Sequence, residues 1–341
     1  MVQSKRIEYI DAIKGFAAIC VIIGHVCDGY LNSGLFGYGG FLYVLFKAIY
    51  SFHMALFFIL SGFLFYNAYV NDDGTIKKEK FKPQLINIGY VYIIFSVIMW
   101  VFKLLSQRFV NRTVSPRDIL FIWAKAISPY WYLYVLFFCY LLAALFIKIK
   151  INPYLLLGIG LAFNIFSNFL SNLGTVSELP KILYYFLIFM LGCFWRKRTD
   201  FFEKHRKKLY IFSGCSIVLL AVVWPFSERI DKVPVANIFV AVGISFLFIF
   251  LFEKVKALGN NRFLQYCGKR ALEIYVIHCF FTAGFRVVLN GIGITSSVLS
   301  LILNTVLSLF LSLAFDWIVK KIKLHSLLFK PYQTLKKRET K

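Results

Sequence analysis

The sequence predicts an all-α integral membrane protein with about ten transmembrane helices and both termini in the cytoplasm. Of its 341 residues, 60% are hydrophobic and only 16% are charged, and the mean hydropathy is +0.71. Ordinary soluble domains have about 45–50% apolar and about 25% charged residues. A water-soluble fold has too little interior to bury 39 Phe, 20 Tyr and 6 Trp. An open sheet in lipid is excluded because its backbone polar groups would stay unsatisfied.

The apolar runs define the expected helices, since a span needs about 20 apolar residues. The run near 41–70 is long enough to be tilted or broken near Ser51-Phe52-His53, and the run near 181–195 is short. No soluble appendage, repeat or low-complexity linker interrupts the pattern, so we expect one polytopic domain over residues 1–341. The ten expected helices lie near residues 9–28, 41–70, 85–105, 128–147, 152–170, 181–195, 209–226, 234–252, 270–290 and 297–319.

The charge pattern predicts the orientation. The formal net charge is +23, which in a soluble protein would suggest a nucleic-acid partner. Here the basic residues cluster in short runs between apolar stretches, as cytoplasmic loops of membrane proteins do. With the N-terminus in the cytoplasm, most of the 39 Lys and Arg fall in inner segments. The 7 cysteines are scattered and form no CxxC pair, so we expect neither a disulfide framework nor a metal site.

Ionisable residues at membrane depth are costly and mark function. The first expected helix carries Asp11, Lys14 and His25. Lys14 and His25 are eleven residues apart, which places them within about 20° of one helix face and roughly 16 Å apart along the axis. Asp11 lies one turn before Lys14 and is a candidate to orient it. The alternatives are a snorkelling Lys14 paired with Asp11 and a structural interhelical His25, but neutral imidazole is the natural general base near pH 7.

Further candidates lie in other apolar runs. His53 and His278 are candidate acceptor-binding residues, and each has the alternative of a satisfied interhelical histidine. Trp131 and Tyr132, at the outer start of the fourth expected helix, are suited to stacking on a sugar; an interfacial aromatic belt is the alternative. The sequence has no Walker A loop, GxSxG elbow, GxGxxG or HExxH, which argues against an ATP-driven pump and a serine hydrolase.

Several segments in order along the chain resemble the membrane acyltransferase 3 family. The opening has Asp, then a basic residue followed by Gly, then His eleven residues after the basic residue. Four later landmarks follow in the family's order, so the resemblance spans nearly the whole chain, and its short form is similar to the fucose 4-O-acetylase-like branch. The segments are Arg6-Ile7-Glu8-Tyr9-Ile10-Asp11-Ala12-Ile13-Lys14-Gly15-Phe16 with Gly24-His25, Phe57-Phe58-Ile59-Leu60-Ser61-Gly62-Phe63, Trp131-Tyr132-Leu133, Phe189-Met190-Leu191-Gly192 and Ile274-Tyr275-Val276-Ile277-His278.

The resemblance implies an acyl-CoA-dependent O-acyltransferase of the bacterial cytoplasmic membrane. The donor is expected to be acetyl-CoA, and the acceptor a hydroxyl of an envelope glycan or its lipid-linked precursor, with glycan-assembly machinery as a further partner. Lys14 and His25 correspond to the family's basic residue and essential histidine. His53, Ser61 and His278 match further family positions, and Ser61 is assigned with Lys14 to the donor.

One departure concerns donor binding. Many members carry Arg-x-x-Arg at the cytoplasmic end of the third helix, where this chain reads Phe81-Lys82-Pro83-Gln84. We expect Lys80 and Lys82, with neighbouring lysines, to hold the CoA phosphates instead. Two other classes stay open, namely a transporter or flippase and a non-catalytic subunit of a polysaccharide export system. Release of free CoA thiol distinguishes the enzyme from both.

Overall fold

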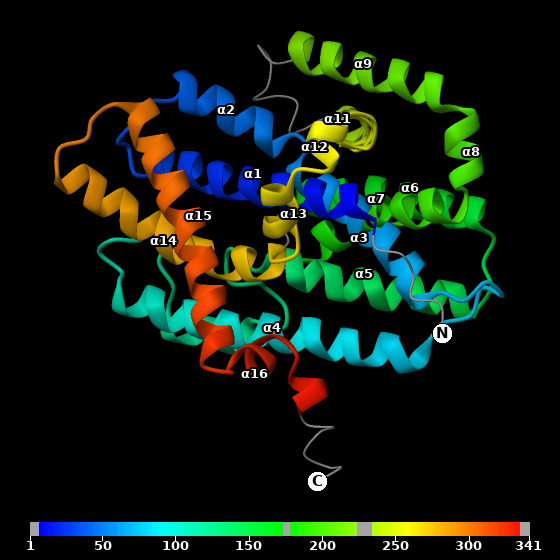
Figure 1. Cartoon of the computed structure of the whole chain (residues 1–341), viewed down its shortest axis with the longest axis horizontal. Coiled ribbons are helices and arrows are strands. Elements are labelled where there is room, and N and C mark those ends of the chain that lie inside the picture. Colours follow the sequence, from blue (N-terminus) through cyan, green and yellow to red (C-terminus); the bar gives the residue numbers. More distant parts are fainter. Residues whose placement is uncertain (1–6, 173–177, 224–233, 335–341) are drawn as a thin grey trace. The chain divides into compact units, whose positions relative to one another are not determined.

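The computed structural model describes all residues except 1–6, 173–177, 224–233 and 335–341 (Figure 1). The described chain folds into helices, with one isolated antiparallel bridge between Val70 and Ile76. This confirms the predicted all-α class. The elements are α1 (Glu8–Asn32), α2 (Phe41–Tyr50), α3 (His53–Tyr69), α4 (Lys78–Leu105), η1 (Pro116–Phe121), α5 (Trp131–Lys148), α6 (Pro153–Asn172), α7 (Leu179–Lys197), α8 (Thr199–Lys204), α9 (Arg206–Val223), α11 (Pro234–Lys254), α12 (Lys256–Gly259), α13 (Arg262–Gly268), α14 (Ala271–Gly291), α15 (Ser297–Lys321) and α16 (His325–Phe329).

Every predicted apolar run has a helical counterpart. Within the described residues, eight helical segments are long and apolar enough to cross a membrane. In α6, the side chains that the structure describes include an apolar stretch over Tyr154–Ser167. The end of the run predicted at 209–226 lies outside the described residues, as do both chain ends, so the count of ten crossings and the cytoplasmic termini stay predictions. The predicted break near Ser51-Phe52-His53 is confirmed, because α2 ends at Tyr50 and α3 begins at His53.

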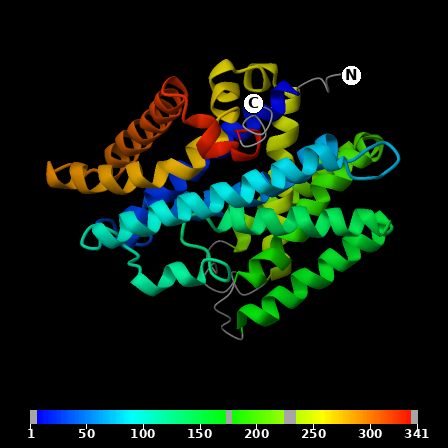
Figure 2. The same cartoon turned by 90° about the horizontal axis from the view of Figure 1, so that it is seen from below.

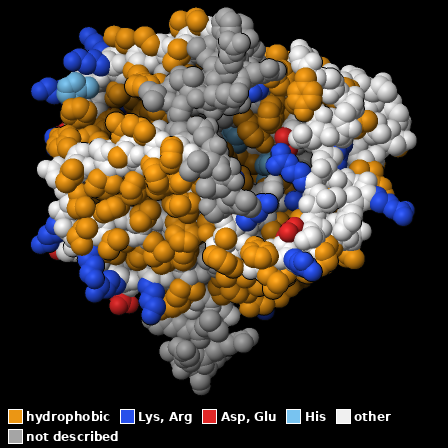
Figure 3. Space-filling view, turned by 180° about the vertical axis from the view of Figure 1, so that it is seen from behind, with side chains coloured by type: hydrophobic (Ala, Val, Ile, Leu, Met, Phe, Trp, Pro, Cys, Tyr) orange, Lys and Arg blue, Asp and Glu red, His pale blue; other side chains and the backbone are white. Residues whose placement is uncertain are grey.

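Apolar side chains on the outside of the helices are typical of a membrane protein. On α4, Ile93, Val97 and Val101 are between 37% and 50% exposed at steps of four residues, which places them in one stripe. α15 carries a similar stripe. On the face shown in Figure 3, hydrophobic side chains form broad areas, and Lys and Arg lie mainly at their margins. Such surface would be unfavourable in water and suits contact with lipid.

The chain divides into two compact units. Unit 1 consists of Met1–Phe57, Lys208–Pro225 and Phe239–Ile318, and unit 2 of Phe58–Lys207, Phe226–Ile238 and Val319–Lys341. In unit 1, α1 packs against α2, α13 and α14. In unit 2, α4 lies beside α5, and α7 packs against α5 and α6 (Figure 2). This division does not test the prediction that residues 1–341 form a single domain.

A pair of glycines brings two helix backbones into contact within each unit. In unit 1, a Cβ atom added to Gly15 would overlap the carbonyl oxygen of Leu264, and one added to Gly268 would overlap that of Asp11. α1 and α13 therefore cross backbone to backbone. Small residues allow helices to approach this closely, and close packing with weak C–H···O contacts stabilises such crossings.

Unit 2 repeats this arrangement between α3 and α7. A Cβ atom on Gly62 would overlap the carbonyl oxygen of Phe189, and one on Gly192 would overlap that of Ile59. Gly15, Gly62 and Gly192 all belong to the segments that resemble the acyltransferase family. Their physical role in this chain is to let helices touch through the backbone.

Candidate active site

The histidines of the first and ninth predicted helices meet in unit 1. The ring centroids of His25 on α1 and His278 on α14 are 5.1 Å apart, with the ring planes inclined by 49°. His25 lies ten residues after Gly15, and His278 lies ten residues after Gly268. The glycine crossing thus sets α1 beside α13, and each segment reaches the imidazole pair ten residues after its glycine.

The ring of His278 is fixed from both sides. The side chain is fully buried, and its Nδ1 lies 3.0 Å from the carbonyl oxygen of Ile274. A carbonyl oxygen only accepts hydrogen bonds, so Nδ1 carries the hydrogen and donates it. In the neutral ring Nε2 is then the acceptor, and it lies 3.2 Å from Sγ of Cys279. An imidazole that donates to a carbonyl oxygen on one side and faces a thiol on the other can take the proton of that thiol.

His53 begins α3 in the same unit. Its Nδ1 donates to the carbonyl oxygen of Ile49 at 2.7 Å, and its side chain is buried. Its ring lies edge-on to Tyr50, at a centroid distance of 4.8 Å. Tyr50 in turn contacts α1, because a Cβ atom added to Gly24 would meet the Tyr50 ring. The structure therefore places the three predicted membrane histidines in one unit, with His53 near the His25 turn of α1.

Lys14 and Asp11 form the predicted pair on α1. Lys14 Nζ lies 3.6 Å from Asp11 Oδ1, and the side chains are 25% and 8% exposed, respectively. This geometry agrees both with an Asp11 that orients Lys14 and with the snorkelling alternative. A partly buried ion pair needs further polar contacts to offset its desolvation. The roles of both residues stay predictions.

The remaining predicted site residues belong to unit 2. Ser61 on α3 and Tyr132 on α5 share a hydrogen bond of 2.8 Å between their hydroxyl oxygens. Trp131 packs on Tyr185 at a centroid distance of 5.3 Å and faces the Lys181 ammonium at 5.3 Å. Lys80 and Lys82 are exposed on the first turns of α4. The structure thus joins Ser61 with Tyr132 through a hydrogen bond. From the sequence, Ser61 was predicted to bind the donor and Tyr132 the acceptor.

The family comparison decides the class. A family model described as "Acyltransferase domain", that of the acyltransferase 3 family, matches residues 7–319. The chain belongs to this acyltransferase family. The resemblance that the sequence motifs carried is therefore confirmed, and with the apolar helices it makes the protein a multi-pass membrane acyltransferase.

One curated relative matches part of the chain, and this match does not narrow the class further. Nodulation protein NolL from Sinorhizobium fredii (strain NBRC 101917 / NGR234) is 28% identical over 141 residues. The match covers 40% of this chain and 35% of NolL, so it spans about a third of that relative's length. No solved structure gives a significant match to the acyltransferase.

Two residues of the acyltransferase's unit 1 were not predicted from sequence. Arg286 on α14 is buried, and its Nη1 donates to the carbonyl oxygen of Gly29 at 3.1 Å, one helical turn beyond His25 on α1. An arginine inside an apolar run was the signal that could have identified it. Cys279 was missed because a lone cysteine in an apolar run gives no signal, although it follows His278 directly.

His25, His278 and Cys279 also form a possible metal-ligand set. One ligand atom from each lies within 4.8 Å of the other two. Two imidazoles and a thiolate are ligands that zinc accepts, and the His278 Nδ1 bond to a carbonyl oxygen is the outer contact typical of a metal-bound histidine. The prediction that the enzyme uses no metal stays a prediction.

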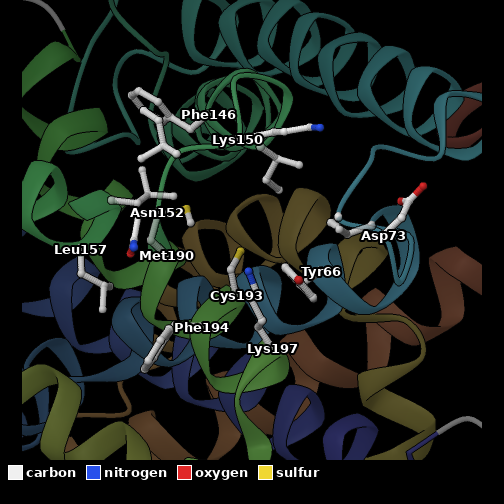
Figure 4. Close-up of a pocket in the computed structure, with 15 residues that line it drawn as sticks. Tyr66, Asp73, Phe146, Lys150, Asn152, Leu157, Met190, Cys193, Phe194 and Lys197 are labelled. Carbon is white, nitrogen blue, oxygen red and sulfur yellow. The ribbon is translucent and has the colours of Figure 1, made fainter. Parts of the chain in front are cut away.

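Unit 2 of the acyltransferase contains a cavity of about 300 Å³ (Figure 4). Phe146, Met190 and Phe194 contribute apolar walls, and Lys150 and Lys197 contribute cations. Asp73 lies on the same lining, and hydrogen bonds from the Thr75 side chain and backbone hold its pKa below the usual value. Such a lining suits a molecule with an apolar portion and an anionic end.

Proposed function

We propose that the protein transfers acetyl from cytoplasmic acetyl-CoA to a hydroxyl of a bacterial cell-envelope glycan or its lipid-linked precursor. The observation that carries this proposal is the contact between His25 and His278 inside unit 1 of a chain from an acyltransferase family. Acyl transfer to a hydroxyl needs a base at the attacking oxygen, and neutral imidazole supplies one near pH 7.

In the proposed reaction, His25 takes the proton of the acceptor hydroxyl as its oxygen attacks the acyl carbon. The carbon–sulfur bond of the thioester breaks, and CoA leaves as the thiol after its sulfur takes the proton from His25. His25 could instead accept the acyl group itself before the hydroxyl attacks, which is the covalent alternative. His278, against which His25 packs, would help to position that ring.

The donor is proposed to be held by charge at the cytoplasmic side. Lys14 is the candidate in unit 1, with Asp11 orienting it, and Lys80 and Lys82 are candidates in unit 2. The acyl end of the donor would have to reach His25, which lies eleven residues after Lys14 on α1. The cavity lined by Lys150 and Lys197 in unit 2 gives the anionic donor a second candidate site.

The acceptor is proposed to use the aromatic and histidine side chains that sequence assigned to it. Trp131 has a partly exposed ring suited to stacking on a sugar. Tyr132 is 9% exposed, and its hydroxyl is already engaged by Ser61, so a role in positioning suits it better than direct stacking. His53 and His278 lie in unit 1 and would contact the acceptor near His25.

Acyl transfer can be tested with inside-out membrane vesicles from cells that express the chain. Radiolabelled acetyl-CoA is supplied to the exposed cytoplasmic face, and two products are measured: free CoA thiol, and label bound to membrane glycan or lipid through an alkali-labile ester. Both are expected above the level of vesicles without the chain. A transporter or a non-catalytic subunit would release no CoA thiol.

Lys14→Ala is expected to raise the KM for acetyl-CoA several-fold and to change kcat less, because it removes a charge that binds the donor's phosphates. Lys14→Arg, which keeps the charge, serves as the matched control and should remain closer to wild type. The measurement is CoA release as a function of acetyl-CoA concentration. An unchanged KM in Lys14→Ala would favour the snorkelling role.

The cavity in unit 2 provides a comparison for that experiment. Lys197→Ala removes one of its cations at the end of α7. A rise in the KM confined to Lys197→Ala would assign the donor's anionic end to the cavity and not to Lys14.

A further inference from the structure

Cys279 stands out among the seven cysteines because it lies against an imidazole nitrogen. Its Sγ is 3.2 Å from Nε2 of His278, which is the acceptor nitrogen of the neutral ring. The Ile274 carbonyl oxygen holds the opposite nitrogen at 3.0 Å. A thiol thus faces an imidazole that a third group orients, which is the combination that activates a nucleophile in thiol enzymes.

The surroundings of Cys279 agree with access by a substrate. His278 is fully buried, whereas Cys279 is partly exposed. Cys20, Cys27, Cys139, Cys193 and Cys267 are buried, and Cys215 is exposed on α9. A ligand atom of His25 also lies within 4.8 Å of Cys279 Sγ. The thiol therefore lies near the imidazole already proposed as the base for the acceptor.

From this geometry we propose that Cys279 is the acyl carrier of the transferase, with His278 as its base. This inference rests on the proposed acyltransferase function and deepens it. It separates the roles of the two histidines: His278 serves the loading of the enzyme, and His25 serves the transfer to the acceptor.

Both half-reactions balance without an oxidant or a metal. In the first, the Cys279 thiol gives its proton to His278 Nε2 and its sulfur attacks the acyl carbon of acyl-CoA. The carbon–sulfur bond to CoA breaks, and the CoA thiolate takes the proton from His278. In the second, the acceptor hydroxyl gives its proton to His25 and its oxygen attacks the acyl-cysteine. The Cys279 sulfur leaves and recovers a proton from His25.

The first half-reaction can be trapped in the absence of acceptor. Purified full-length protein in detergent is mixed with acetyl-CoA and quenched in acid. We expect one equivalent of CoA thiol per protein, a mass increase of one acetyl group, and a hydroxylamine-sensitive label on the peptide that contains Cys279. Cys279→Ala should lose the label, and Cys215→Ala, which changes an exposed cysteine of the same unit, should keep it.

Transfer to membrane acceptor should fall by about 10²–10⁴-fold in Cys279→Ala, within the range for losing a positioned catalytic group. Cys279→Ser keeps the shape of the side chain and guards against misfolding, which thermal melting and size-exclusion chromatography check. Folded Cys279→Ala with wild-type transfer would overturn the carrier assignment and leave the acyltransferase proposal intact. Wild-type protein that releases no CoA, even with acceptor membranes, would overturn both.

His25→Ala gives the sharpest discrimination. If Cys279 carries the acyl group, this variant should still release one equivalent of CoA and then accumulate acetyl-Cys279 that acceptor membranes discharge only slowly. Absence of any acyl-enzyme in folded His25→Ala would indicate that His25 itself is the carrier. A chelator that abolishes wild-type transfer, with recovery on adding Zn²⁺, would replace the thiol carrier by a metal held by the same three residues.

Discussion

His25→Ala is expected to lower acyl transfer by about 10²–10⁴-fold, the range typical for removal of a positioned general base. The loss is expected because no neighbouring group described around His25 is placed to replace it as the base. His278 is the nearest imidazole, and its Nδ1 is engaged with the Ile274 carbonyl oxygen while its Nε2 faces Cys279. His278 therefore cannot replace His25 as the base without losing these two contacts.

The measurement is incorporation of alkali-labile acetyl label in inside-out vesicles at saturating acetyl-CoA. His205→Ala is the matched control, because His205 lies between α8 and α9, outside the candidate membrane spans. It should transfer like wild type. His25→Gln retains hydrogen-bonding capacity and helps to keep the helices packed. Near-wild-type turnover in either folded His25 variant would show that the base is another residue.

Gly15→Ala is expected to cause a large loss of stability in unit 1. The added methyl group would overlap the Leu264 carbonyl oxygen, and because that atom is backbone, the helices must separate to make room. Overpacking a well-packed site costs about 1–3 kcal/mol and sometimes more. Thermal melting in detergent should show a lower Tm and a smaller yield of monodisperse protein.

Gly284→Ala on α14 is the matched control, because a Cβ atom there meets nothing within 4 Å. It should melt at or slightly above the wild-type temperature, since alanine favours the helix over glycine. In unit 2, Gly192→Ala and Gly158→Ala form the same contrast, with α3 touching the first position and open space at the second. A Gly15→Ala protein as stable as Gly284→Ala would contradict the close crossing.

The sequence predicted the class of fold because bilayer thickness imposes a strong requirement on helix length and polarity. It also located the break between α2 and α3, since Ser51 interrupts the apolar run beside His53. The run near 152–170 also gave no sign that α6 buries polar side chains such as Asn164 and Ser167. Apolar runs alone do not distinguish lipid-facing from protein-facing helix surface.

The candidate site was only partly predictable. Helical spacing along α1 identified Lys14 and His25 as one stripe, and the structure confirms that Asp11 lies beside Lys14. The meeting of His25 with His278 could not be read from spacing, because these residues lie far apart in the chain and only the packing of α14 on α1 joins them. The Ser61–Tyr132 bond and the Cys279 contact depend on packing in the same way.

The backbone crossing at Gly15 and Gly268 also has a consequence for how the chemistry is kept aligned. A sliding movement of α1 along α13 by one residue, about 1.5 Å, would drive a side chain into a carbonyl oxygen. The crossing thus fixes the register of α1 against α13. Each of the two segments reaches its histidine ten residues after its glycine. The contact between two glycines thereby helps to align two imidazoles, of which His25 lies about 15 Å further along α1.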